Sequence, residues 1–159
     1  MPDVLICEVG PRDGLQNAKH LMPSAAKKAW VAALAAAGLR EIEVGSFVPP
    51  RLIPAMADTG EIVAFARTIA GLKVVALAPN LKGFQRALDA GAQKVTFPVS
   101  ASRKHSESNV RMTPEQMVEE VRKCAEHAHP GVEIEGAVST AFGVTPSAAA
   151  LSRSMVTCT

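Results

Sequence analysis

The alternation of short apolar segments with longer helical patterns is the feature that most constrains the fold of this chain. Apolar segments rich in β-branched residues predict strands at 4–9, 41–47, 73–78, 94–99 and 133–139. The intervening segments predict helices at 23–37, 58–71, 81–90 and 113–128. A repeat of about 25 to 40 residues per strand and helix favours parallel strands joined by right-handed crossovers. We therefore expect an α/β fold with about five parallel strands and four helices.

Proline and small polar residues mark the starts of the predicted helices. Pro23 opens the first helix, and Gly38 follows its end. Asp58 is expected to cap the second helix, and Thr113, followed by Pro114, is expected to cap the fourth.

Two architectures fit this order of elements, an open doubly wound sheet and part of a (β/α)8 barrel. In both folds a site forms at the carboxyl ends of the strands, and several of the predicted strands end in polar residues. An independent flavodoxin-like domain would need a phosphate-binding loop after its first strand. Pro11 removes a backbone donor there, which disfavours that alternative.

The last 16 residues break the pattern. Residues 144–159 are small and polar, and they predict neither an amphipathic helix nor a sixth strand, although a weak helix over 147–156 stays open. We divide the chain into a partial barrel domain at 1–143 and an atypical tail at 144–159.

Composition excludes several classes of protein. The net charge of +2 gives no reason to expect binding to nucleic acid or to a membrane surface. Cys7, Cys124 and Cys158 are far apart without a C-x-x-C pair, so we expect buried, reduced thiols. The chain shows no signal peptide and no membrane span, and the expected location is the cytoplasm.

The segment from Glu8 to Asn17, EVGPRDGLQN, carries the strongest functional signal. A strand ends there in a glycine–proline turn that presents Arg12 and Asp13 side by side. A carboxylate in such a turn can bind a hard divalent cation, and a guanidinium can stabilise a developing oxyanion. For an isolated Arg–Asp pair the alternative is a capping carboxylate beside a surface arginine.

This segment resembles the first-strand signature of the hydroxymethylglutaryl-CoA lyase family. Further blocks are similar in the same order, at 37–39, 43–48, 54–58, 79–84, 90–92, 109–119 and 136–143. The resemblance covers roughly residues 2 to 143. It implies the N-terminal portion of a (β/α)8 TIM barrel that is incomplete in this chain. Homocitrate- and isopropylmalate-synthase-like enzymes share the fold, but they usually carry an Asp-Arg-Glu-like motif where this chain has Arg12-Asp13-Gly14.

The resemblance implies a role for each matching residue. Asp13 would be a metal ligand with a part in proton transfer, and Arg12 would stabilise the enolate of the departing acetyl-CoA. Glu43 would lie near the substrate and the water shell of the metal, although its alternation with Glu41 also fits a solvated strand face. Residues expected to bind substrate or to line the mouth are Gln16, Ser46 and Asn80.

The implied reaction is the cleavage of 3-hydroxy-3-methylglutaryl-CoA to acetyl-CoA and acetoacetate, with Mg²⁺ or Mn²⁺ as cofactor. The family's reaction belongs to leucine degradation and ketone-body formation. The family also uses a His-x-His pair on the seventh strand, an asparagine on the eighth and a glycine-rich loop with a cysteine. None of these is found in the chain, so we expect it to be inactive by itself.

The remaining histidines do not replace those ligands. His127 and His129 have His-x-His spacing, but they fall at a predicted helix end, where residues two apart point about 200° apart. They are expected to be solvated and to interact favourably with the helix dipole at that end. His20 and His105 are expected in surface loops, with a contact between His105 and CoA phosphates left open.

Five strands cannot close a barrel, so the first and fifth strands are expected to expose edges that promote self-association. The resemblance also allows a family-like homodimer. The loss of pattern after Gly143 suggests a frameshifted or early-terminated tail. The alternative function is a catalytically inactive half-barrel that acts as a binding or self-assembling module.

Overall fold

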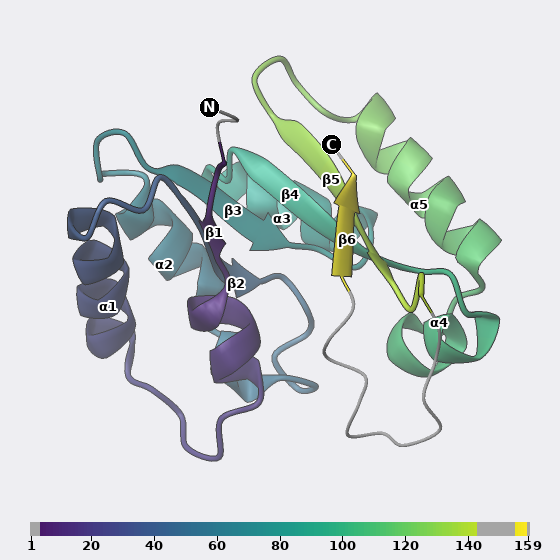
Figure 1. Cartoon of the computed structure of the whole chain (residues 1–159), viewed down its shortest axis with the longest axis horizontal. Coiled ribbons are helices and arrows are strands. Elements are labelled where there is room, and N and C mark those ends of the chain that lie inside the picture. The colour runs from purple at the N-terminus through teal and green to yellow at the C-terminus, as the bar shows by residue number, and fades with distance from the viewer. Residues whose placement is uncertain (1–3, 143–154, 159) are drawn as a thin grey trace.

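The computed structural model describes residues 4–142 and the backbone of 155–158, and its centre is one curled sheet (Figure 1). The strands follow one another in sequence order, β1-β2-β3-β4-β5-β6. The first five are parallel, namely β1 (Cys7–Glu8), β2 (Glu41–Ser46), β3 (Lys73–Leu77), β4 (Lys94–Ser100) and β5 (Glu133–Ser139). This half-barrel confirms the predicted partial TIM-barrel fold.

Four helices occupy the predicted crossovers, and a fifth was missed. The expected ones are α1 (Ser24–Ala36), α2 (Thr59–Ala66), α3 (Leu81–Ala90) and α5 (Pro114–Glu126). The additional helix is α4 (Arg103–Val110), which begins after Ser102. Its sequence has no apolar stripe, and only Ser106 is buried, so hydrophobic periodicity gave no signal for it. Two short turns complete the structure, η1 (Gly10–Gly14) and η2 (Pro54–Met56).

Of the two predicted helix caps, Thr113 and Asp58, only Thr113 caps its helix in the structure. Thr113 forms a complete capping box with Gln116. Asp58 stands before α2, but its side chain makes no capping bond, because its carboxylate binds Lys27 and Ser24 instead. The second helix also ends at Ala66 rather than at the predicted residue 71.

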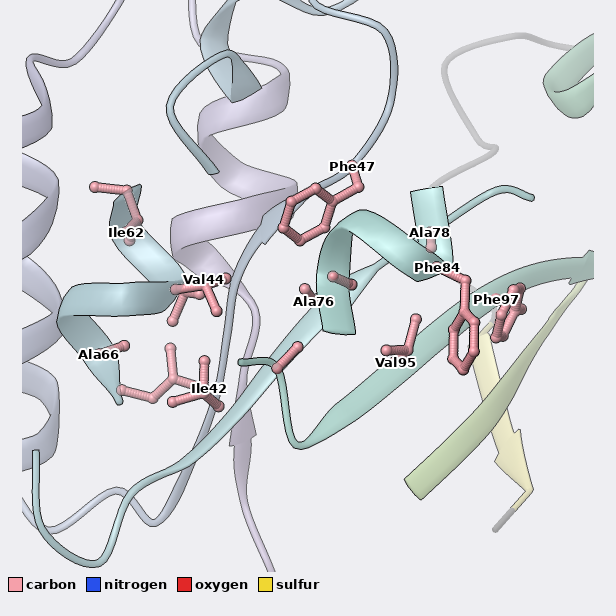
Figure 2. Close-up of a cluster of buried hydrophobic side chains, with 14 of the residues drawn as sticks. Ile42, Val44, Phe47, Ile62, Ala66, Ala76, Ala78, Phe84, Val95 and Phe97 are labelled. Atoms are coloured by element: carbon pink, nitrogen blue, oxygen red, sulfur yellow. The ribbon is translucent and has the colours of Figure 1, made fainter. Parts of the chain in front are cut away.

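The core lies between the helices and the outer face of the sheet. Figure 2 shows Ile42 and Val44 of β2 beside Ile62 and Ala66 of α2. Farther along the sheet, the rings of Phe84 and Phe97 are 5.8 Å apart between their centroids. Because outward positions alternate with inward ones along each strand, Glu41 and Glu43 share the inner face of β2.

The tail contains a strand that the sequence analysis did not expect. β6 (Met155–Cys158) pairs antiparallel with β5. The prediction that the tail lacks a sixth strand is therefore wrong. The weak helix over 147–156 is also wrong at residues 155 and 156, which belong to this strand. Residues 147–154 of that helix and the proposed boundary at 143 lie outside the described residues. The outer edge of the fifth strand is therefore covered at 136–139, where β6 pairs with it, and β6 is the terminal strand of the described sheet on that side.

The first strand is shorter than predicted. Only Cys7 and Glu8 pair with β2, whereas Val4, Leu5 and Ile6 precede the ladder and are exposed. Cys7 is also exposed, against the expectation of buried thiols, while Cys124 is buried as expected. The side chain of Cys158 lies outside the described residues. Within the described part, no helix is both long enough and apolar enough to cross a membrane.

Candidate active site

The EVGPRDGLQN segment folds into a tight turn at the carboxyl end of β1. The backbone N–H groups of Arg12 and Asp13 both donate to the carbonyl oxygen of Val9, at 3.1 and 2.7 Å. The N–H of Gly10 donates to Glu8 Oε1 at 2.6 Å. A Cβ at Gly10 would lie 2.8 Å from that oxygen, so a larger residue there would displace the Glu8 carboxylate. The turn directs the Arg12 side chain toward β2.

Arg12 is held between two carboxylates. Its side chain is buried, with 5% of the residue exposed, and its Nε donates to Glu43 Oε2 at 2.9 Å. Its Nη2 lies 2.8 Å from the same oxygen, and its Nη1 donates to Asp13 Oδ1 at 2.9 Å. We call Arg12, Asp13 and Glu43 the mouth cluster. One cation faces two carboxylates there, which leaves one negative charge in excess when both are ionised.

The two carboxylates of the mouth cluster differ in their access to solvent. Glu43 is 2% exposed, and its Oε1 has no hydrogen-bond partner in the described part of the chain. Burial raises the pKa of Glu43 above its ordinary value, although the Arg12 guanidinium opposes that shift. The Asp13 side chain is 39% exposed. The mouth cluster therefore presents one accessible carboxylate and one buried, partly unsatisfied one.

A second group of charges fills the inner face nearer the amino ends of the strands. Lys94 Nζ donates to Glu41 Oε1 at 2.9 Å and forms an ion pair with Glu135. We call Lys94, Glu41 and Glu135 the floor cluster. Burial alone would lower the pKa of Lys94, but hydrogen bonds and charge from the two carboxylates raise it above its usual range. Because Glu41 and Glu43 are both buried, the alternative of a solvated face on β2 is wrong.

Sequence reasoning missed the floor cluster. The available signal was the period-two spacing of charged residues in otherwise apolar strands, at Glu41 and Glu43 and again at Glu133 and Glu135. Inward-facing charges in a buried strand need partners, and Lys94 at the start of β4 was the matching cation.

The other predicted site residues lie around the strand ends without a hydrogen bond to the mouth cluster among the described residues. Ser46 ends β2, and its buried Oγ has no described partner. Its backbone N–H donates to Thr59 Oγ1 at 3.2 Å, and Gly45 packs so closely on Thr59 that a Cβ on Gly45 would lie 2.6 Å from that oxygen.

Asn80 caps α3 by accepting from the N–H of Gly83. Gln16 is half-buried after the turn. Their roles stay predictions.

The histidines behave largely as predicted. His127 Nδ1 lies 2.7 Å from the carbonyl oxygen of Lys123 at the end of α5 and is exposed, which confirms a helix-end role. His129 and His20 are exposed. His105 is not in a loop but on α4, where its Nδ1 lies 2.9 Å from Ser100 Oγ. Across the described residues, no group of three histidine, cysteine or acidic side chains is arranged to hold a metal ion.

Comparison with known proteins places this geometry in a family. The family model described as HMGL-like matches residues 3–152. The mitochondrial hydroxymethylglutaryl-CoA lyase of Arabidopsis thaliana is 40% identical over 141 residues, which are 88% of this chain and 30% of that protein. The 3-hydroxy-3-isohexenylglutaryl-CoA/hydroxymethylglutaryl-CoA lyase of Pseudomonas aeruginosa is 42% identical over 141 residues, with 88% of this chain and 47% of that protein covered.

A solved structure gives the same result. An HMG-CoA lyase of Acinetobacter baumannii, in complex with coenzyme A and 3-methylmalate, matches with a TM-score of 0.83 and 35% identity. The match covers 87% of this chain and 46% of that one. The chain thus spans less than half the length of these relatives. Since the family model covers most of the residues and the half-barrel superposes on a structure of the same family, the chain belongs to the HMGL-like family.

Proposed function

We propose that this chain carries the N-terminal half of a hydroxymethylglutaryl-CoA lyase site. The observation that supports the proposal is Arg12 held between Glu43 and Asp13 at the carboxyl end of the sheet. In barrel enzymes that end carries the chemistry. The relatives act on hydroxymethylglutaryl-CoA or bind coenzyme A by their names, so an acyl-CoA is the proposed substrate.

The mouth cluster fits a divalent cation. Asp13 offers an accessible carboxylate, and the excess negative charge of the cluster would be neutralised by a cation. The unpartnered Oε1 of Glu43 is a second acceptor, suited to a hydrogen bond from a water or a substrate hydroxyl. Mg²⁺ and Mn²⁺ prefer such oxygen donors. When bound, the metal would polarise the hydroxyl and carboxylate oxygens of the substrate.

The proposed cleavage moves one proton and one electron pair. The tertiary C3 hydroxyl of the substrate loses its proton, and the C2–C3 bond breaks. C3 becomes the ketone carbon of acetoacetate, and the bonding electrons form the enolate of acetyl-CoA, which is then protonated on carbon. Arg12 would hold the negative thioester oxygen, and Glu43 would fix the orientation of the guanidinium. Asp13 would assist the transfer of the hydroxyl proton.

A chimera tests this function directly. Residues 1–143 would be joined to the remaining part of the Pseudomonas aeruginosa relative and assayed with hydroxymethylglutaryl-CoA and Mn²⁺. We expect the chimera to release acetoacetate and the chain alone to release none. Arg12→Met in the chimera should lower kcat about 100- to 1,000-fold, as for loss of one oxyanion donor. A folded chimera that binds Mn²⁺ but cleaves nothing would contradict the proposal.

The second candidate is a catalytically inactive module that binds a partner or associates with itself. It is favoured by the lack of a three-residue metal site among the described residues and by the exposed edge of β1. Acetoacetate released by the purified chain alone would exclude this candidate. The relatives include mitochondrial and cytoplasmic enzymes, so the cytoplasmic location stays a prediction.

A further inference from the structure

A third polar group lies at the carboxyl ends of β4 and β5, separate from the mouth and floor clusters. Ser100 Oγ lies 2.9 Å from His105 Nδ1 and 3.0 Å from Thr140 Oγ1. The backbone N–H of Ser102 donates to Ser100 Oγ at 3.3 Å and to Thr140 Oγ1 at 3.1 Å. We call Ser100, Ser102, His105 and Thr140 the hydroxyl network. It connects the last residue of β4, the residue after β5 and helix α4.

The position of Ser100 along β4 places it on the inner face of the sheet. Lys94 of the floor cluster and Ser100 are separated by an even number of residues, whereas Phe97 between them packs in the core on the outer face. Ser100 pairs in register with Ser139 of β5, and the N–H of Ala101 donates to the Ser139 carbonyl oxygen at 3.0 Å. Ser100 therefore lies at the carboxyl end of the inner face, the end that carries the chemistry in barrel enzymes.

The network is held in an unusual conformation. Thr140 has a φ of 60°, in the left-handed region that β-branched residues rarely adopt. Backbone strain of this kind is concentrated at functional sites. Ser100 is 3% exposed and Thr140 is 8% exposed, whereas His105 is half-buried. The middle of the network is therefore enclosed, and its histidine end is accessible.

The side-chain protons of the network leave one donor unused. A neutral imidazole carries one N–H, and each of the two hydroxyls carries one O–H. The contacts of Ser100 with His105 and Thr140 use two of these three protons. When His105 donates from Nδ1, the free proton is on a hydroxyl, and when Ser100 donates to Nδ1, it is on His105 Nε2. In both arrangements the network can donate to one additional acceptor.

We propose that the hydroxyl network binds a carboxylate of the acyl substrate, as an anion subsite that complements the mouth cluster. The identity of this ligand rests on the proposed lyase function. The network offers a free donor and contains no carboxylate of its own. The mouth cluster has an excess negative charge, so without a cation it repels an anion that the network can accept.

The spacing of the two sites suits a short dicarboxylic acyl group. Glu43 and Ser100 lie on β2 and β4, two strand intervals apart, which is about 10 Å along the sheet. A glutaryl group with a hydrogen bond at each end spans a distance of this order. Arg12 would hold the thioester oxygen while the network holds the carboxylate. A carboxylate has two oxygens, so one stays free for the cation proposed at the mouth cluster.

Glutarate is the probe for the first test, with the full chain and without metal. Nuclear magnetic resonance follows the ring signals of His105, which are assigned with the His105→Gln variant. We expect glutarate to shift these signals saturably in the millimolar range, and the uncharged diamide glutaramide to bind at least about tenfold more weakly. The signals of His20, His127 and His129 should not move with the same saturation.

Two substitutions test the network itself. Ser100→Ala removes the hydroxyl that positions both His105 and Thr140, and Thr140→Val removes the second hydroxyl while keeping its shape. Each should raise the Kd of glutarate about tenfold. Ser106→Ala is the matched control and should leave the Kd unchanged, because Ser106 is 1% exposed on the same helix and its Oγ has no described partner. Circular dichroism checks that each variant is folded.

The chimera with the Pseudomonas aeruginosa relative separates this inference from the lyase function. There Thr140→Val should raise the KM for hydroxymethylglutaryl-CoA more than it lowers kcat, whereas Arg12→Met lowers kcat. A chimera that cleaves nothing, while glutarate still shifts His105, would contradict the lyase function alone. The inference is overturned if glutarate gives no saturable shift at His105, if glutaramide binds equally well, or if Ser106→Ala weakens binding as much as Ser100→Ala and Thr140→Val.

Discussion

The mouth cluster and the floor cluster contain the same charges in different surroundings. Each has one cation and two carboxylates, and β2 supplies one glutamate to each. In the floor cluster all three side chains are largely buried, and Lys94 contacts both of its partners. In the mouth cluster Asp13 is accessible, whereas Glu43 resembles Glu41 of the floor cluster in having one buried oxygen without a described partner.

This difference shows that position along the strands, rather than charge composition, separates a structural group from a candidate site. Ion pairs enclosed by the sheet stabilise one arrangement of the strands, and losing one partner is costly. At the carboxyl ends the same groups meet solvent and can accept a ligand.

The largest effect is expected from Lys94→Met in the floor cluster. The substitution leaves Glu41 and Glu135 buried without their cation, and we expect a loss of about 3–5 kcal/mol in the free energy of unfolding. Urea denaturation measures it. Lys73→Met is the control, because the Lys73–Glu133 pair is largely exposed and should be worth less than about 1 kcal/mol. Equal losses in the two variants would show that the floor cluster is not a buried structural group.

An intermediate effect is expected from Glu43→Gln, in the pH dependence of stability. The pKa of Glu43 is raised in the folded chain, so its contribution to stability is full below its unfolded pKa and is lost as pH rises through the folded pKa. Glutamine does not titrate. The stability advantage of the unsubstituted chain over Glu43→Gln should therefore shrink as pH rises from about 4.5. If denaturation curves instead show a growing advantage, attraction to Arg12 outweighs burial.

A smaller effect is expected in metal binding. The unsubstituted chain should bind Mn²⁺ weakly through the mouth cluster, and Asp13→Asn should weaken binding roughly tenfold, because it removes the accessible charged ligand. Electron paramagnetic resonance of free Mn²⁺ measures this. Glu135→Gln in the floor cluster is the matched control and should leave the affinity unchanged. Comparable weakening by both substitutions would remove the distinction between the clusters.

The smallest effect concerns Cys7, beside the floor cluster. Packing around the thiol, together with the Glu41 carboxylate, raises the pKa of Cys7 to about 12, although the residue is exposed at the edge. Alkylation by iodoacetamide at pH 8 should therefore be slow, and Glu41→Gln should speed it several-fold by removing the nearby negative charge. Mass spectrometry of the labelled chain follows the rate. An unchanged rate would mean that Glu41 does not act on the thiol.

Particular elements show how far the sequence alone could predict the fold and the site. The order of five strands and the four amphipathic crossovers was predictable because hydrophobic periodicity is a local property. Helix α4 was not, because its eight residues bury little apolar surface. Strand β6 was not, because its pairing depends on the free edge of β5 rather than on its own pattern.

The candidate site, like the fold, was predictable from the sequence only in part. The motif around Arg12 and Asp13, together with Glu43, was visible in the sequence through the family resemblance, and the structure brings these three residues together. The expected place of Asn80 at the mouth stays a prediction, and its side-chain oxygen caps α3. The capping role had a local signal, since asparagine directly precedes the helix.

The sequence by itself determined the first five strands, most of the helices, the turn after β1 and the family of this chain, because each depends on residues close together in sequence. Only the tertiary structure decided that Glu43 binds Arg12 whereas Glu41 binds Lys94, and that β6 pairs with the outer edge of β5. Those outcomes depend on the register between strands far apart in sequence, and the packing of the whole sheet sets that register.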